Sequence, residues 1–183
     1  MTKERMTKER MTTEREFMPL NIAILTVSDS RTEANDSSGA SLQKMLQADG
    51  HRLAEKQIVA DDRYLIRAVI SRWIADDNIS VVITTGGTGL TGRDGTPEAV
   101  LPLVDKVIDG FGEMFRMLSY EKIKTSTIQS RAMAGVANGT FIFCLPGSTG
   151  ACKDGWKMLI STQLDYRTRP CNLVELIPRL NEV

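Results

Sequence analysis

The pattern of apolar and polar positions divides the first half of the chain into alternating strands and helices. Apolar runs rich in β-branched residues predict buried strands at residues 20–27, 53–59 and 79–85. Between them, apolar residues spaced three or four positions apart predict amphipathic helices at about residues 38–49 and 64–73. This alternation indicates a parallel sheet whose strands are joined by helical crossovers.

Proline and glycine residues guide the prediction for the next segment. Thr96 as N-cap and Pro97 at the first helical position predict a helix over residues 97–105. The sequence Gly-Phe-Gly-Glu at residues 110–113 predicts a turn, and the apolar side chains at residues 114–118 predict a helix after it.

The second half of the chain contains a strong hairpin signal. Asn138-Gly139 separates two strand-like runs, residues 133–137 and 140–145, and predicts a type I′ turn between them. A further helix is expected around residues 156–160. One strand pair is therefore antiparallel. The predicted fold class is α/β: a three-layer α/β/α sandwich with a mostly parallel sheet and one antiparallel hairpin strand.

Length and composition favour one globular domain. The chain has 183 residues, enough for a single well-formed core. We expect the domain to span residues 19–183 and residues 1–18 to form a flexible tail. Residues 1–16 repeat Met-Thr-Lys-Glu-Arg imperfectly and without apolar periodicity, which is typical of a solvated extension. An interaction arm is the alternative for this segment.

Charge and aromatic content exclude several classes of partner. Lys and Arg together number 23, as do Asp and Glu, and aromatic residues make up 5% of the chain. Neither nucleic acid nor a membrane surface is therefore an expected partner. No apolar stretch approaches the roughly 20 residues of a membrane span, and the N-terminus lacks the apolar core of a signal peptide. We expect a cytoplasmic protein.

The cysteine and histidine content limits the available chemistry. Cys144, Cys152 and Cys171 lie far apart without accompanying histidines, which favours reduced residues over a zinc site. The single histidine, His51, follows a glycine at a helix-to-strand corner and is expected to be structural. Ser-His-Asp and Cys-His catalysis then lack an imidazole, so acid–base or metal chemistry depends on carboxylates.

Polar or glycine-rich loops follow four of the predicted strands, at residues 28–39, 60–62, 86–95 and 146–150. Parallel strands end on one rim of a sheet, where ligands of open α/β proteins bind. The Gly-Gly-Thr-Gly sequence that opens the third loop suits a phosphate, because glycines bring several backbone N–H groups close to one anion. Such a rim, with separate carboxylates, can hold a polyphosphate and its magnesium.

Each of these features also has a purely structural explanation. Glycine clusters serve as tight strand-to-helix turns, and Asp94 can be a loop carboxylate that accepts backbone hydrogen bonds. The neighbouring glycines and Arg93 favour a functional role for Asp94. Asp61 is typical of a helix N-cap or first-turn acid. Ser119 and Ser130 fit ordinary helix-end and strand-start positions.

Six motifs carry a resemblance to a known family. They are TVSD at 26–29, TTGGTG at 84–89, GRDGTPEA at 92–99, GFGEMFR at 110–116, QSRAMAGVANGT at 129–140 and LPGST at 145–149. Together they closely resemble the molybdenum cofactor biosynthesis family of MoaB and MogA, which includes the G domains of gephyrin-type proteins. The resemblance covers roughly residues 20–175 and is nearest to the MoaB branch.

This resemblance implies an α/β/α sandwich that binds molybdopterin and assembles as a trimer or hexamer. In the catalytic branch, ATP adenylylates the terminal phosphate of molybdopterin and pyrophosphate is released. By position, Asp61 and Asp94 match the acidic residues that would be catalytic and hold Mg²⁺, with ATP and molybdopterin as substrates. The residues expected to bind the substrates are Ser28, Gly86, Gly87, Thr88, Gly89, Ser119, Ser130, Gly147 and Ser148. Other proteins of molybdenum cofactor biosynthesis are further expected partners.

Two other functions stay open at this point. A non-catalytic oligomer would bind molybdopterin or a nucleotide and carry or protect the unstable pterin. A scaffold or regulatory module on the same fold would bind neither ligand. Magnesium-dependent ATP consumption that requires molybdopterin would distinguish the enzyme from the carrier.

Overall fold

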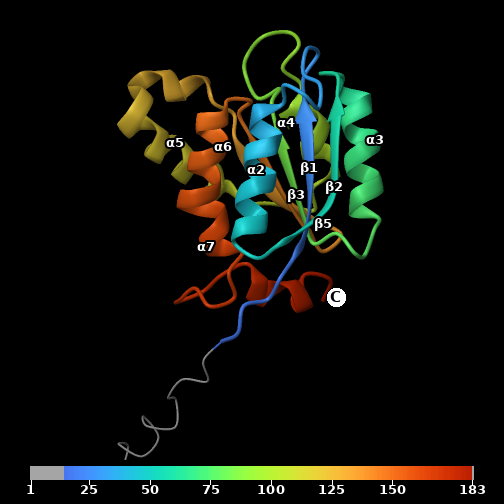
Figure 1. Cartoon of the computed structure of the whole chain (residues 1–183), viewed down its shortest axis with the longest axis vertical. Coiled ribbons are helices and arrows are strands. Elements are labelled where there is room, and N and C mark those ends of the chain that lie inside the picture. Colours follow the sequence, from blue (N-terminus) through green and yellow to red (C-terminus); the bar gives the residue numbers. More distant parts are fainter. Residues whose placement is uncertain (1–14, 183) are drawn as a thin grey trace, which may run out of the picture.

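The computed structural model describes residues 15–182 and contains one six-stranded sheet. Its strands are β1 (Asn21–Val27), β2 (Arg52–Val59), β3 (Val81–Thr85), β4 (Lys106–Val107), β5 (Met133–Ala137) and β6 (Thr140–Leu145). They lie in the order β2-β1-β3-β6-β5-β4. Strand β5 runs antiparallel to both of its neighbours, β4 and β6, and the pairs among β2, β1, β3 and β6 are parallel. The predicted mostly parallel sheet with one antiparallel hairpin strand is therefore confirmed (Figure 1).

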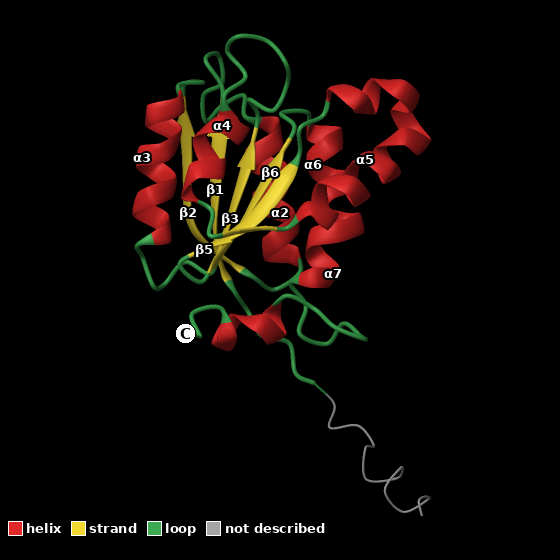
Figure 2. Ribbon diagram, turned by 180° about the vertical axis from the view of Figure 1, so that it is seen from behind, coloured by secondary structure: helices red, strands yellow, loops and turns green. Residues whose placement is uncertain are grey.

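Helices cover both faces of this sheet and complete the three predicted layers (Figures 1 and 2). The α-helices are α2 (Ser37–Ala48), α3 (Arg63–Ile74), α4 (Thr96–Val100), α5 (Asp109–Ile123), α6 (Thr149–Gly155) and α7 (Ser161–Gln163). A π-helical segment, Trp156–Ile160, joins α6 to α7. Short 3-10 segments occur at η1 (Leu101–Leu103), η2 (Lys124–Gln129) and η4 (Val174–Arg179).

Alternate side chains of β1 supply the two halves of the core, as expected for a strand buried on both faces. Ile22 and Ile24 are fully buried and belong to one core cluster, which includes Leu42 of α2 and residues of α5 and α6. Ala23 and Leu25 belong to the other cluster, which includes side chains of α3 and α4. The two clusters hold the strand ends, and so the loops after them, in fixed positions.

The predicted helix over residues 97–105 is wrong at both ends. Gly95 is the N-cap of α4, and the Thr96 hydroxyl instead donates a 2.9 Å hydrogen bond to the Gly86 carbonyl. The α-helix ends at Val100, before Pro102. Proline has no N–H to donate to the carbonyl four residues earlier. That carbonyl, of Glu98, accepts a 2.8 Å hydrogen bond from Arg67 of α3 instead.

The predicted turn at residues 110–113 is also wrong, because these residues form the first turns of α5. Phe111 is buried, and its ring lies 5.2 Å from that of Phe143. A Cβ atom at Gly112 would lie 2.6 Å from the carbonyl oxygen of Ala132. The glycine therefore marks close packing of α5 against another segment, and not a turn.

Histidine and cysteine side chains have packing roles. His51 is buried against Trp156, and its Nδ1 accepts a 3.2 Å hydrogen bond from the Leu20 backbone, which confirms the structural prediction. Burial lowers the pKa of His51, and this favours the neutral ring that such an acceptor requires. Cys144 and Cys152 are buried and free, and burial raises the pKa of their thiols to about 12 and about 11.

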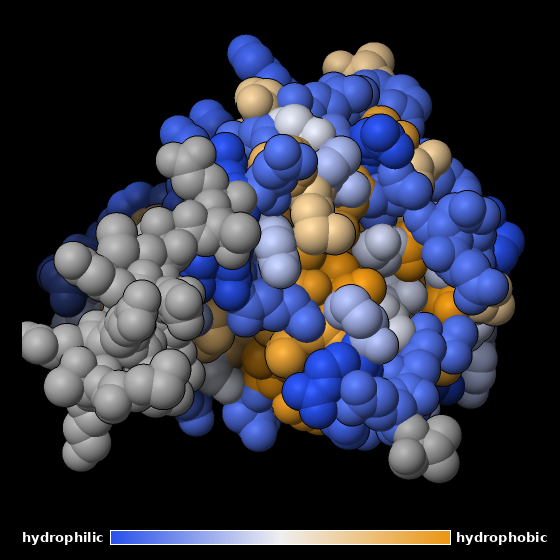
Figure 3. Space-filling view, turned by 90° about the horizontal axis from the view of Figure 1, so that it is seen from below, coloured by the Kyte–Doolittle hydropathy of each residue, from blue (hydrophilic) through white to orange (hydrophobic). Residues whose placement is uncertain are grey.

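The two ends of the described chain meet beneath the sheet. Most of the predicted tail, residues 1–14, lies outside the described residues, but Phe17 packs against His51 with ring centroids 5.0 Å apart. Leu173 and Ile177 of the C-terminal segment pack against the core. In the view from below, apolar surface shows between polar side chains at this end (Figure 3). None of the helices described between residues 15 and 182 combines the length and the apolar character of a membrane span.

Candidate functional site

A cavity of about 940 Å³ opens at the carboxyl ends of β1, β3 and β6. The loops after these strands form one side of it, and α5, η2 and α6 form the other. The predicted site residues that line it are Ser28, Gly86, Gly87, Thr88, Gly89, Asp94, Ser119, Ser130, Gly147 and Ser148. The structure thus brings every predicted substrate-binding residue and one predicted catalytic carboxylate together, whereas Asp61 is not among the lining residues.

Glycines at the strand ends allow these loops to approach one another. Gly86 and Gly87 have φ angles of 106° and 63°, which side chains rarely adopt. A Cβ atom at Gly86 would collide with the carbonyl oxygen of Val27, and one at Gly147 would lie 3.2 Å from the Gly86 Cα. The backbones after β1, β3 and β6 therefore meet directly. The Gly86 N–H donates a 3.0 Å hydrogen bond to the Leu145 carbonyl, and the turn that follows at Gly87 and Thr88 can approach an anion closely.

Asp94 lies in the loop that precedes α4 and carries an ionised carboxylate. Its Oδ2 accepts hydrogen bonds from the hydroxyl and the backbone N–H of Thr91, at 2.6 and 2.8 Å. The hydroxyl hydrogen bond is the main reason that the pKa of Asp94 falls below its ordinary value, and it outweighs the opposing effect of burial. The side chain therefore presents a negative charge to the cavity at neutral pH.

Asp61 lies on the other side of the same loop. Its Oδ1 accepts a 3.2 Å hydrogen bond from the backbone of Gly95. Asp62 is the N-cap of α3, with hydrogen bonds from the backbones of Tyr64 and Leu65, so the N-cap explanation of Asp61 is wrong. Burial raises the pKa of Asp61, and the nearby charges of Asp94 and Asp29 raise it further.

Asp29 is a third carboxylate at this rim, and the sequence analysis did not include it in the site. Its Oδ1 accepts a 3.1 Å hydrogen bond from the backbone of Asp61, and its Oδ2 pairs with Arg93 at 2.6 Å. Asp29 therefore links the loops that follow β1, β2 and β3. The available signal was its position immediately after β1, at the end of the TVSD motif.

Asp61 and Asp94 have the donor chemistry that suits magnesium. Within residues 15–182, no group of three or more His, Cys, Asp or Glu side chains is arranged to hold a metal ion. Mg²⁺ commonly takes one or two carboxylates and completes its coordination with water and phosphate oxygens. The repulsion that raises the pKa of Asp61 would be relieved by a cation between the carboxylates. These residues fit Mg²⁺ bound together with a phosphate.

Three serines at the cavity differ in the use of their hydroxyl groups. The Ser28 Oγ accepts hydrogen bonds from the backbones of Ser30 and Arg31, and the Ser148 Oγ caps α6 through the backbone of Ala151. In contrast, the buried Oγ of Ser130 has no hydrogen-bond partner among residues 15–182. A buried hydroxyl normally has a hydrogen-bond partner, so the Ser130 hydroxyl is suited to bond to a ligand in the cavity.

Three basic side chains that line the cavity were not predicted from the sequence: Arg31, Lys122 and Lys153. Lys122 of α5 pairs with Asp154 of α6 at 2.5 Å, across the cavity wall. Lys153 lies three residues after the glycine-containing loop that follows β6, whereas Lys122 adjoins no such motif, so the position of Lys122 depends on how α5 packs beside α6. Their charges suit an anionic ligand of the size that this cavity admits.

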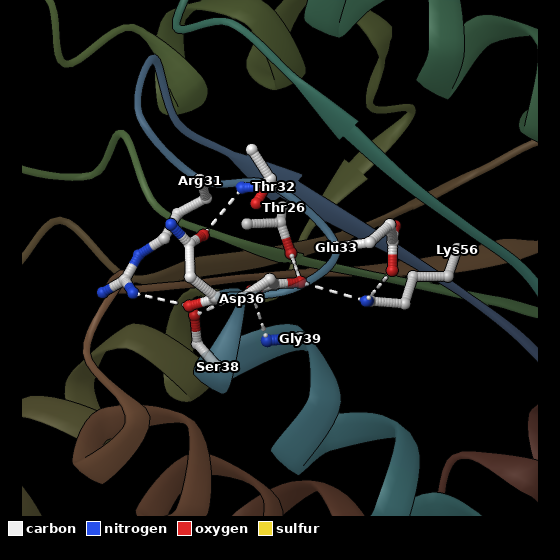
Figure 4. A network of polar contacts seen from close by, with 9 residues as sticks. Thr26, Arg31, Thr32, Glu33, Asp36, Ser38, Gly39 and Lys56 are labelled. Atoms are coloured by element: carbon white, nitrogen blue, oxygen red, sulfur yellow. Dashed lines mark hydrogen bonds and ion pairs between the residues drawn. The ribbon is translucent and has the colours of Figure 1, made fainter.

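A buried polar network fixes the loop that follows β1 (Figure 4). Asp36 is 2% exposed, and it accepts hydrogen bonds from the Thr26 hydroxyl and the Gly39 backbone, each at 2.9 Å. Lys56 of β2 lies 3.2 Å from the same carboxylate and 2.8 Å from Glu33. This network joins β1, β2 and the start of α2, and so anchors both ends of the loop that carries Ser28.

The fold and the cavity together define a class of protein: an α/β/α sandwich with a glycine-rich cavity at a switch in strand order. From β1 the chain passes to β2 on one side and then to β3 on the other, and the cavity lies outside this point. Residues 23–166 match the family described as "Probable molybdopterin binding domain". The chain belongs to this family of molybdenum cofactor biosynthesis proteins, in its MoaB/MogA branch.

Relatives of known name cover most of the chain. Molybdenum cofactor biosynthesis protein B of Escherichia coli (strain K12) is 59% identical over 157 residues, which are 86% of this chain and 92% of that protein. The protein of the same name from Staphylococcus aureus (strain Mu50 / ATCC 700699) is 46% identical over 147 residues, which are 79% of this chain and 87% of that protein.

Solved structures agree with this assignment. A crystal structure of molybdenum cofactor biosynthesis protein B has a TM-score of 0.80 and 40% identity, covering 82% of this chain and 94% of that chain. The tungsten cofactor synthesizing protein MoaB from Pyrococcus furiosus has a TM-score of 0.71 and 36% identity, and the match covers 78% of this chain and 91% of that chain.

Proposed function

We propose that this protein binds molybdopterin in the cavity and transfers the adenylyl group of ATP to its terminal phosphate, with release of pyrophosphate. Membership of a molybdopterin-binding family supports the choice of pterin. The observation that carries the proposal is the convergence of three features on one cavity. They are a glycine-rich turn, the ionised Asp94 and the unpartnered hydroxyl of Ser130.

The reaction requires positioning more than a strong base. A phosphate oxygen of molybdopterin attacks the α-phosphorus of ATP, and the bond from that phosphorus to the bridging oxygen breaks as pyrophosphate leaves. Because the attacking phosphate is already ionised, no proton has to be removed. Catalysis then depends on alignment and on stabilisation of the charge that moves to the leaving group.

The lining residues supply these functions. The backbone N–H groups of Gly87 and Thr88 and the Ser130 hydroxyl would donate hydrogen bonds to phosphate oxygens, and Lys122 and Lys153 would offset the negative charge. Ser119, Gly147 and Ser148 complete the walls. Asp94 and Asp61 would hold Mg²⁺, which neutralises charge on the phosphates when it is bound. Asp29 orients Asp61 through its backbone.

We further propose that the protein self-associates as a trimer or hexamer and works with other proteins of molybdenum cofactor biosynthesis. Large apolar side chains of α5 and η2 support self-association. Met117, Tyr120 and Ile128 are 56%, 48% and 75% exposed, which is unusual for neighbouring side chains of this size.

A non-catalytic carrier of molybdopterin is the second candidate function. One observation favours it: the Asp94 carboxylate already accepts two hydrogen bonds from Thr91, and Asp61 does not line the cavity. A site arranged in this way binds the pterin phosphate through the glycine turn and the lysines, without any use of the carboxylates in catalysis.

The test is turnover by the purified protein. Molybdopterin and Mg-ATP should yield adenylylated molybdopterin and pyrophosphate, and Asp94→Ala should lower kcat by at least about 100-fold because a major charged group of the site is lost. The dissociation constant for molybdopterin, measured by its fluorescence, should change less than about threefold because the glycine turn and Ser130 remain.

Asp77→Ala is the matched control, since Asp77 is an exposed aspartate between α3 and β3, away from the cavity. It should retain the turnover of the unaltered protein. Unchanged turnover in Asp94→Ala would refute the role of Asp94. Tight pterin binding with no product from the unaltered protein would establish the carrier.

A further inference from the structure

The loop that carries Asp94 has little packing of its own. Residues 90–93 are exposed, and the Leu90 side chain faces solvent. Inside the loop, Asp94 and Thr91 bond to each other through their backbones and the Asp94 carboxylate. These bonds fix the shape of the loop, but not its position relative to the cavity. Contacts from outside must determine that position.

The Arg93–Asp29 pair and the Gly95–Asp61 hydrogen bond supply some of these contacts on the side of β1 and β2, and Arg131 supplies contacts at both ends of the loop on the side of β5. Its Nε donates a 2.7 Å hydrogen bond to the carbonyl of Gly89, and its Nη2 donates a 2.9 Å hydrogen bond to the carbonyl of Asp94. Its backbone N–H donates to the carbonyl of Thr88 at 3.3 Å. One residue thus joins the start and the end of the loop to the segment before β5.

The guanidinium of Arg131 is itself held in orientation by Glu98 of α4. Its Nη1 donates to the Glu98 Oε1, while the other carboxylate oxygen of Glu98 is buried without a partner in the part of the chain that the structure describes. All three guanidinium nitrogens are therefore engaged by the loop or by the helix that follows it. Arg131 does not line the cavity, so any effect on a bound ligand must pass through the loop.

We propose that Arg131 is a positioning residue that sets the location of Asp94 at the cavity by clamping the carbonyls of Gly89 and Asp94. The inference rests on the proposed adenylyl transfer. An arginine suits this task because its planar guanidinium presents several donors in a rigid arrangement. A lysine at the same place keeps the positive charge but has a single flexible ammonium, which cannot reproduce the clamp.

The test compares Arg131→Lys and Arg131→Gln with Arg116→Lys. Arg116 of α5 also donates to a backbone carbonyl, that of Ala132, but it contacts neither the loop nor the cavity. Each Arg131 variant should lower kcat by about 100-fold, the effect expected of a displacement near 1 Å, with little change in KM for molybdopterin. Arg116→Lys should keep both parameters.

A second readout does not depend on activity. Hydrogen exchange at the amides of Thr91 and Asp94 should become faster in Arg131→Lys and stay unchanged in Arg116→Lys. Full kcat in Arg131→Lys would overturn the proposal, since charge alone would then suffice, and unchanged exchange in the loop would also overturn it. If the unaltered protein shows no turnover, the proposed function fails, and the exchange rates alone decide whether Arg131 positions the loop.

Discussion

Asp36 is almost fully buried, and its environment determines whether it stabilises the fold. Burial opposes ionisation, but hydrogen bonds from Gly39 and Thr26 and the charge of Lys56 together outweigh it and lower the pKa of Asp36. A buried carboxylate with this many partners stabilises the native state when ionised. Among the described residues, removal of its charge leaves Lys56 with only the exposed Glu33 as an ionic partner.

Asp36→Asn should therefore destabilise the protein by about 2–3 kcal/mol at pH 7, measured by urea denaturation. Asparagine also caps helices, so this variant removes the charge while it retains the N-cap hydrogen bond to Gly39. Glu33→Gln is the control. It removes an exposed partner of the same lysine and should cost at most about 1 kcal/mol. Equal losses in both variants would contradict this account of Asp36.

The loss of stability in Asp36→Asn should depend on pH in a way that follows from the lowered pKa of Asp36. The folded-state pKa of Asp36 lies below the unfolded value of 3.8, so its ionisation stabilises the fold above that value. This contribution is lost as the pH falls through the folded-state pKa. The stability difference between the unaltered protein and Asp36→Asn should therefore be equal at pH 7 and pH 5 and shrink only below 3.8. A decline between pH 7 and pH 5 would implicate a different group.

Single residues of the site were predictable to different degrees. Asp94 and the glycines could be identified because they share one short motif at a strand end. Asp29 had the same kind of signal in weaker form. Arg131 lies within the QSRAMAGVANGT motif but nothing there indicated its contacts, and Lys122 lies in none of the motifs; the roles of both arise from contacts with segments 42 and 32 positions away in the sequence. Such contacts follow from packing, which local patterns do not report.

At the scale of elements, the glycine turn after β3 determines how closely β1 and β3 can approach at the rim. Gly86→Ala places a side chain against the Val27 carbonyl and on a backbone with positive φ. We expect a loss of more than about 2 kcal/mol in the free energy of unfolding, with weaker molybdopterin binding. Chemical denaturation and pterin fluorescence measure the two effects.

Gly110→Ala is the matched control for this substitution. Gly110 lies in the first turn of α5 without positive φ, and a Cβ atom there meets open space. Alanine should leave stability unchanged or raise it by up to about 1 kcal/mol. Similar losses at both positions would mean that the packing of Gly86 against β1 has no special importance.

Elements with strong local signals were predicted correctly. The Asn138-Gly139 hairpin forms with positive φ at both residues, as its type requires. The two-residue strand β4 was not predicted, because it is exposed and exists only through its pairing with β5. Helix α4 ends earlier than predicted for a local reason, because Pro102 has no N–H to donate. The Glu98 carbonyl accepts a hydrogen bond from Arg67 instead, and Arg67 belongs to another helix, α3.

For the whole molecule, the prediction that several strand-end loops share one rim was sound because it depends only on parallel strands. Strand order was not available from the sequence, and it places the loops after β1, β3 and β6 around the cavity. The wall formed by α5 and α6 also depends on packing between helices. In Figures 1 and 2, α5 lies beside α6 and projects from one side of the molecule.

This projection leads to a prediction about assembly. Met117 on α5 and Ile128 on η2 are exposed and do not line the cavity, so their substitution leaves the lining intact. If self-association buries this surface, Met117→Glu and Ile128→Glu should each shift the protein toward monomer, because a buried unpaired carboxylate opposes association. Sedimentation velocity gives the mass of each species. Leu65→Glu is the control, since Leu65 is similarly exposed on α3, on the opposite face of the sheet. Dissociation by Leu65→Glu alone would locate the interface at α3, and a monomeric unaltered protein would refute self-association.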